Sequence, residues 1–95
     1  MILKNTNTLA RKTSVINELG MHARPASRIA QMALDAKSDV WLCTDDTRVD
    51  ASSIIDILTL CAVKGTDVEV KIDNPDDRAV LDQIVAFFED GFGEL

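Results

Sequence analysis

The chain has 95 residues, 46% of them hydrophobic, and carries a formal net charge of −6. The length predicts one small domain, and the hydrophobic content excludes a disordered chain. The negative charge argues against nucleic acid or an anionic membrane surface as a partner, and no apolar run approaches the ~20 residues of a membrane span.

The compartment is suggested by the start of the chain and by its cysteines. A loose, mostly polar lead-in is expected over residues 1–8 and a single domain over residues 9–95. The lead-in has no basic region followed by a long apolar core, so no secretory signal is predicted. Cys43 and Cys61 form neither a Cys-x-x-Cys motif nor a dense framework, and reduced, buried thiols of a cytoplasmic protein are expected.

The first half of the domain is predicted to contain a strand, a helix and a hairpin. Residues 9–16 form the strand, since alternate side chains share one face. Residues 23–34 form the helix, because apolar residues recur with a period of 3.6. The two strands of the hairpin are expected at residues 39–44 and 47–51, around an Asp-Asp turn. The apolar stripe of the helix consists of Ala26, Ile29, Ala30, Ala33 and Leu34.

The second half is predicted to contain a helix, a strand and a last helix. The first of these helices starts at Ser53, with Asp56 as a capping-box partner, and ends at Lys64-Gly65. Residues 67–72 alternate as a strand. The run Asn74-Pro75-Asp76-Asp77 starts the last helix with a cap, a proline and acidic side chains. Its core stripe consists of Val80, Leu81, Ile84, Val85 and Phe88. The order is βαββαβα, and the most economical packing puts all helices on one face of a small sheet.

His22 is the only histidine, and its neighbours make it the leading candidate for chemistry. Gly20 ends one element and Pro25 lies near the start of the next, so His22 is placed at, or just before, the first helical residue. A helix N-terminus has unpaired backbone N–H groups and favours anions. Neutral imidazole is a nucleophile that can carry a phosphoryl group, and Arg24 offers a fork of donors. A solvated or capping surface histidine is the alternative, and no metal site is expected without a second histidine.

One segment of the chain reads Leu19-Gly20-Met21-His22-Ala23-Arg24-Pro25-Ala26. It resembles the active-site motif of the HPr family, the histidine-containing phosphocarriers of the bacterial sugar phosphotransferase system. The family pattern is a glycine and a bulky apolar residue, followed by His-x-Arg-Pro-Ala. A serine before an apolar patch and a glycine turn over residues 64–70 match two further signatures, so the resemblance covers roughly residues 9–92. The Met-His-Ala-Arg segment and the Gly-Phe pair near the C-terminus resemble sequences of the nitrogen-related branch of the family. The sequence does not decide between the sugar branch and the nitrogen-related branch.

The resemblance implies a fold and an activity. The fold is an α+β open-faced β-sandwich, with three helices on one face of a four-stranded, mostly antiparallel sheet. The activity is that of a monomeric phosphocarrier, without a cofactor, which takes a phosphoryl group from enzyme I on His22 and passes it to IIA domains. Catalysis would rest on His22 and Arg24, and phosphate binding on Ala23 and Arg24. The alternative is a regulatory paralogue that docks onto regulators or enzymes and is controlled by phosphorylation of Ser53.

The second helix is expected to serve partners as well as the core. Ser53 is predicted to cap it, with Ser52 as the other candidate. In some bacterial groups of the family this serine is phosphorylated, so a serine kinase/phosphorylase is an expected partner. A short helix that is apolar all round cannot bury every side chain, and exposed apolar patches mark interfaces. The expected docking residues are Met21, Arg28, Ile54, Ile55 and Leu58. Asp56 departs from the basic residue that many relatives carry, which makes this surface less positive.

Overall fold

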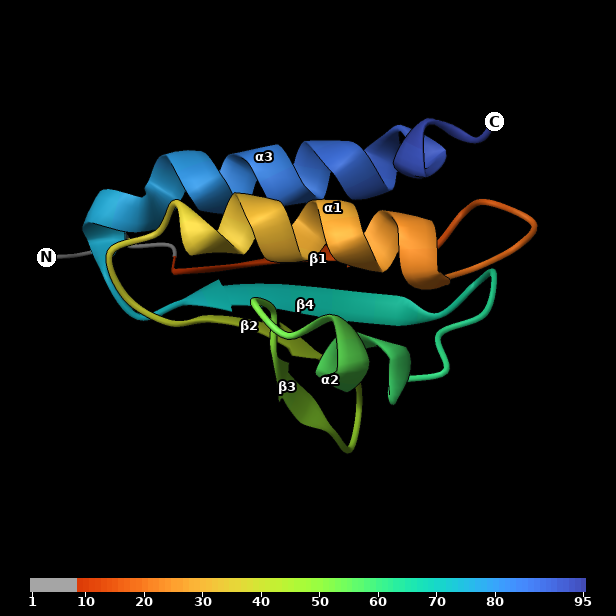
Figure 1. Ribbon diagram of the computed structural model, residues 1–95, viewed down its shortest axis with the longest axis horizontal. Coiled ribbons are helices and arrows are strands. Elements are labelled where there is room, and N and C mark those ends of the chain that lie inside the picture. Colours follow the sequence, from red (N-terminus) through yellow and green to blue (C-terminus); the bar gives the residue numbers. More distant parts are fainter. Residues whose placement is uncertain (1–8) are drawn as a thin grey trace, which may run out of the picture.

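The computed structural model describes residues 9–95 (Figure 1), and the expected lead-in over residues 1–8 lies outside the described residues. The predicted element order βαββαβα is confirmed. A turn of 3-10 helix, η1, leads directly into the last α-helix, and a second one, η2, follows it. The elements are β1 (Ala10–Ser14), α1 (Ala23–Leu34), β2 (Val40–Cys43), β3 (Arg48–Asp50), α2 (Ile54–Leu58), β4 (Asp67–Ile72), η1 (Pro75–Asp77), α3 (Arg78–Glu89) and η2 (Gly91–Gly93).

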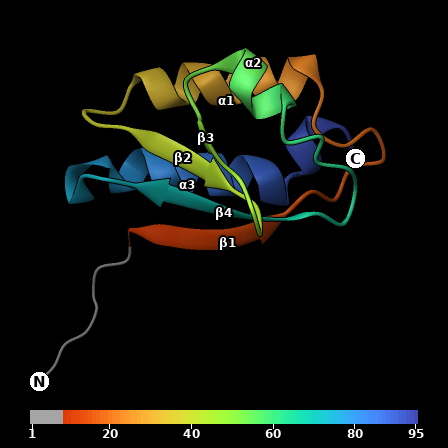
Figure 2. The ribbon, with the colours of Figure 1, turned by 90° about the horizontal axis from the view of Figure 1, so that it is seen from below.

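The four strands form one antiparallel sheet in the order β1-β4-β2-β3. Strand β4 lies between β1 and β2, and its alternation sets the two faces of the sheet: Val68, Val70 and Ile72 are buried, whereas the residues between them point the other way. The helices lie together on one side of the strands (Figure 2). This is the predicted open-faced sandwich, and its uncovered face remains open to solvent.

The core lies between the sheet and helices α1 and α3. Each helix turns one apolar stripe toward the strands, as its 3.6-residue period requires. All five predicted core residues of α3 are buried. In α1 the stripe is buried except for Leu34, which is 71% exposed. Leu34 is the last residue of the helix and lies about 80° around the helix axis from Ala26, so it extends past the edge of the buried face.

Helix α2 corrects two expectations. Ser53 caps it and accepts the backbone N–H of Asp56 at 3.2 Å. The reciprocal half of the capping box is absent, because the N–H of Ser53 donates to the carbonyl of Asp50 at 3.1 Å. The helix ends at Leu58 rather than at Lys64-Gly65. Cys61 then adopts a φ of 50°, in the left-handed region that an α-helix does not use.

The thiols differ from the buried pair that was expected. Both cysteines are free, Cys43 is half-buried, and Cys61 is exposed on the loop after α2. Within the described part of the chain, no helix combines the length and the apolar character needed to cross a membrane.

Candidate functional site

His22 is the N-cap of α1, where the residue pattern placed it. Its backbone is extended, with φ −130° and ψ −173°, and its carbonyl accepts the N–H of Ala26 at 3.0 Å. Its side chain makes no capping hydrogen bond and is 30% exposed. The imidazole is therefore directed away from the helix backbone and remains accessible for other chemistry.

A close backbone contact fixes the loop that carries His22. Gly20 has a φ of 69°, and a Cβ there would lie 2.7 Å from the carbonyl oxygen of Ala62. The next residue, Met21, donates its N–H to that same oxygen at 2.8 Å. Only glycine satisfies both the left-handed φ and this approach. The histidine loop, residues 15–22, is thereby held against the loop that joins α2 to β4.

The nearest partner of His22 is a residue that the sequence analysis did not identify. His22 Nε2 lies 2.7 Å from Oε2 of Glu94, the penultimate residue of the chain. Arg24 shares this oxygen, with its guanidinium nitrogen 3.3 Å away. The Glu94 side chain is only 12% exposed, whereas that of Arg24 is 74% exposed. Glu94 is therefore the fixed member of the group and Arg24 the one that can move.

Asn17 connects Glu94 to the histidine loop. It is 1% exposed, and its Nδ2 donates to Oε1 of Glu94 at 2.8 Å and to the carbonyl of Gly20 at 2.9 Å. Burial alone would raise the pKa of Glu94. The hydrogen bonds from His22 and Asn17, together with the electrostatic attraction of His22 and Arg24, outweigh burial and hold that pKa below its ordinary value. Glu94 is thus a carboxylate at neutral pH.

The other residues predicted for the site lie on both flanks of α1. Ala23 is the first residue of the helix and is exposed, and backbone N–H groups of this first turn have no partner within the helix. Arg28 lies one turn further along and packs with its guanidinium carbon 5.2 Å from the ring centroid of Phe87. Arg28 therefore faces α3, whereas Arg24 turns toward His22 and Glu94.

The predicted docking residues of α2 lie on the other flank of α1, and they are accessible to different degrees. Ile55 is 75% exposed and Ile54 40% exposed, whereas Leu58 and Met21 are half-buried. Ile57 is fully buried and anchors the helix. Leu19 of the histidine loop, which is 72% exposed, and Val63 of the loop after α2, which is 67% exposed, are further exposed apolar residues that the sequence analysis did not assign to docking.

The two serines that precede α2 have distinct roles. Ser53 is the cap, as predicted, and is half-buried. Ser52 is not, because its N–H and its hydroxyl both donate to Oδ1 of Asp50, at 2.8 and 2.7 Å. Ser53 is thus the serine whose oxygen lies at the N-terminus of α2.

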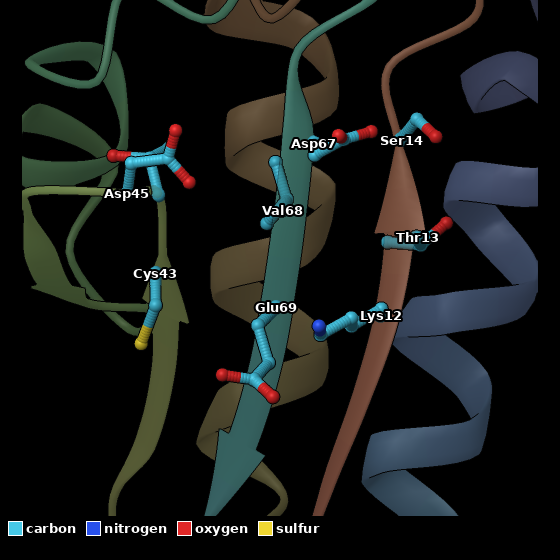
Figure 3. Close-up of a pocket in the computed structure, with 9 residues that line it drawn as sticks. Lys12, Thr13, Ser14, Cys43, Asp45, Asp67, Val68 and Glu69 are labelled. Atoms are coloured by element: carbon cyan, nitrogen blue, oxygen red, sulfur yellow. The ribbon is translucent and has the colours of Figure 1, made fainter.

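A separate hollow lies on the open face of the sheet (Figure 3), and none of its lining residues belongs to the histidine loop. Its lining includes Lys12, Cys43 and three carboxylates, those of Asp45, Asp67 and Glu69. Burial raises the pKa of the Cys43 thiol, so this thiol is not an activated nucleophile. The carboxylates disfavour a phosphate there. Among the residues that the structure describes, no three His, Cys, Asp or Glu side chains are arranged to hold a metal ion.

Comparison with known proteins gives a consistent result. The family model of the phosphotransferase-system HPr component phosphorylation site matches residues 9–90. The phosphocarrier protein HPr of Neisseria meningitidis is 38% identical over 87 residues, which cover 87% of this chain and 98% of that protein. The phosphocarrier protein NPr of Escherichia coli is 34% identical over 88 residues, covering 92% and 98%.

Solved structures agree with these relatives. The crystal structure of an HPr from Thermoanaerobacter tengcongensis superimposes with a TM-score of 0.83 at 30% identity, covering 90% of this chain and 97% of that one. Crh, the Bacillus subtilis catabolite repression protein, superimposes with a TM-score of 0.68 at 28% identity, covering 96% and 97%, and its structure is described as a swapped dimer.

Proposed function

Since this chain belongs to the HPr family and is a phosphocarrier of the phosphotransferase system, we propose that His22 is the residue on which it carries the phosphoryl group. The observation that carries the proposal is the position of His22 as a partly exposed N-cap beside Arg24. An exposed ring can meet a donor protein and then an acceptor protein. The alternative, a regulatory paralogue, has weaker support, because the matching family model and the curated relatives describe phosphocarriers.

The transfer step needs charge stabilisation more than acid–base chemistry. The lone pair of His22 Nδ1 attacks the phosphorus atom carried by phosphorylated enzyme I. As the N–P bond forms, the bond between phosphorus and the donor atom breaks, and its electron pair leaves on the donor. Such a transition state is loose, so positioning and electrostatics dominate the rate. The backbone N–H of Ala23 and the guanidinium of Arg24 would bind the phosphoryl oxygens.

We propose enzyme I as the donor and IIA domains as the acceptors. Both would bind a surface made of the histidine loop and the exposed isoleucines of α2, with Met21 and Leu58 between them and Arg28 at the α3 flank. We propose a serine kinase/phosphorylase that modifies Ser53 as a further partner, supported by the position of Ser53 at the N-terminus of α2, beside the exposed isoleucines. The chain would act as a cytoplasmic monomer. The pairing of β1 with β4 in five register pairs joins distant parts of the chain in one sheet and supports a single domain over residues 9–95.

An intact-mass experiment tests the assignment of His22. The chain is incubated with enzyme I and phosphoenolpyruvate, and it is expected to gain the mass of one phosphoryl group. The adduct should be lost in acid and kept in base, as an N–P bond requires. His22→Ala should gain nothing, whereas Ser53→Ala, the matched control at the other candidate position, should gain the same acid-labile mass as the wild type. An acid-labile gain in His22→Ala would refute the assignment.

A further inference from the structure

The last five residues of the chain return to the histidine loop. Gly91, Phe92 and Gly93 have φ values of 61°, 58° and 74°, so three consecutive residues lie in the left-handed region. This run reverses the chain after α3. Both ribbon views place the C-terminus beside the loop that precedes α1 (Figures 1 and 2).

The returning segment is packed in place. Phe92 is 6% exposed, and its ring centroid lies 5.2 Å from that of Phe87 and 5.0 Å from that of Phe88. A non-glycine residue at positive φ is uncommon and indicates that the surrounding contacts impose the conformation. A Cβ on Gly91 would lie 2.3 Å from the side chain of Leu95, so the glycine leaves room for Leu95 to fold back over the turn. These contacts hold Glu94 at a defined position.

Both oxygens of the Glu94 carboxylate have assigned partners. Oε1 accepts the amide of buried Asn17 at 2.8 Å, and Oε2 lies 2.7 Å from His22 Nε2. An ionised carboxylate can only accept hydrogen bonds. The proton of a neutral His22 ring must therefore lie on Nε2, and the lone pair must lie on Nδ1. Nδ1 has no hydrogen-bond partner among residues 9–95.

We propose that Glu94 is a positioning residue that holds His22 in the Nε2–H tautomer and thereby selects Nδ1 as the atom that takes the phosphoryl group. This inference rests on the proposed function of His22. It assigns a role in phosphoryl transfer to the C-terminal segment, which lies 72 positions away from the histidine in the sequence.

The carboxylate would also act during transfer. When Nδ1 bonds to phosphorus and the donor bond breaks, Nε2 keeps its proton and the ring becomes positive. Glu94 lies against that N–H and balances the charge. Arg24 touches Glu94 through one contact of 3.3 Å and is largely exposed, so it can turn to the incoming phosphoryl oxygens while Glu94 stays in place.

The tautomer of His22 can be read directly by ¹⁵N NMR of the imidazole in the full-length chain. The wild type is expected to give the Nε2–H tautomer. In Glu94→Gln the amide can donate as well as accept, so it can also pair with an unprotonated Nε2, and a mixture of tautomers is expected. The matched control is Glu89→Gln, which removes one negative charge from an exposed position on α3 and should leave the tautomer unchanged.

The rate of phosphoryl transfer from enzyme I should fall when the Nε2–H tautomer of His22 becomes less populated. Phosphorylation of Glu94→Gln is expected to slow by about tenfold, the lower end of the loss seen when a partner that orients a metal-binding histidine is mutated. Phe92→Ala keeps the carboxylate but releases the segment, so it should show the same two changes in smaller measure. If Glu94→Gln does not fold, the Phe92→Ala variant tests the positioning role of Glu94 in its place.

Separate results would refute the inference and the proposed function. Wild-type tautomer populations together with wild-type transfer rates in Glu94→Gln would refute the role of Glu94 and leave the assignment of His22 intact. Phosphorylation on Nε2 of the wild type would do the same. A wild-type chain that is not phosphorylated on His22 at all would refute the proposed function, whatever the NMR spectra show.

Discussion

Arg24 and Arg28 are two exposed arginines on one helix that have different neighbours, and this difference gives a matched test of charge at the site. If the Arg24 guanidinium stabilises the phosphoryl group in transit, Arg24→Ala should slow transfer by roughly 10²-fold with the fold unchanged, the size expected for one donor to a developing anion. Lysine should rescue only part of the rate, because it lacks the planar fork.

Arg28→Ala is the control for Arg24, because it removes the same charge one turn away, where the side chain packs on Phe87. Rapid-quench kinetics with phosphorylated enzyme I would measure both variants, and circular dichroism would check the fold. If Arg28 contributes to docking, its loss raises KM and leaves the rate at saturation unchanged. Equal effects of the two variants at saturating donor would exclude a specific role for Arg24.

The same residues show how far the sequence predicted the site. His22 and Arg24 are identified by a local pattern, a glycine before and a proline after, which fixes where the helix starts. Glu94 and Asn17 have no such pattern. Their contact depends on three left-handed residues in succession, and one of these, Phe92, is a residue type that local propensity would not place there. Only the packing of Phe92 against α3 brings the carboxylate to the imidazole.

The helices differ in how completely the sequence determined them. The limits of α1 were predicted to the residue, because its apolar stripe recurs over more than two turns and its start is set by a proline. Helix α2 has five residues, too few to show a period, and its end is set by the positive φ of Cys61, which has no signature in the sequence. The capping serine was assigned correctly because a cap needs only one oxygen at the first turn.

Ser53 offers a test of α2 as a regulatory element. Aspartate is as good an N-cap as serine, and a negative charge is favourable at a helix N-terminus. Ser53→Asp should therefore keep its helical circular dichroism and melt no lower than the wild type. The added charge lies beside the exposed Ile54 and Ile55, and its desolvation on binding would oppose docking, so phosphate should be accepted from enzyme I more slowly.

Ser53→Asn is the matched control, because asparagine caps equally well and carries no charge. It should transfer at the wild-type rate. If Ser53→Asp also transfers at that rate, Ser53 is a structural cap and the regulatory proposal is wrong. Ser53→Ala should lose about 1 kcal/mol of stability through the missing cap alone, which separates the structural contribution of the serine from its effect on partners.

A buried carboxylate holds the chain together at the end of the helices opposite the histidine loop. The histidine loop and the C-terminal segment lie at one end, and η1 lies at the other (Figure 1). At that far end Asp77 is 3% exposed and accepts the backbone N–H groups of Lys37 and Ser38, at 2.8 and 3.0 Å. It joins the segment between α1 and β2 to the start of α3. The sequence analysis identified Asp77 only as part of a helix start.

Asp77→Ala should therefore destabilise the fold without changing the chemistry. Removal of this buried carboxylate breaks two part-buried, charge-assisted hydrogen bonds from the N–H groups of Lys37 and Ser38, which costs about 2–4 kcal/mol. For a domain of this size, a loss of this kind lowers the melting temperature by roughly 10–20 °C. Asp76→Ala, the control next in the chain, removes an exposed carboxylate whose contact with Lys37 is 3.6 Å long, and it should cost less than about 1 kcal/mol.

Well below its melting temperature, Asp77→Ala should accept phosphate at the wild-type rate, because nothing at the histidine loop depends on η1. A variant that melts normally but transfers slowly would show that the two ends of the molecule are coupled.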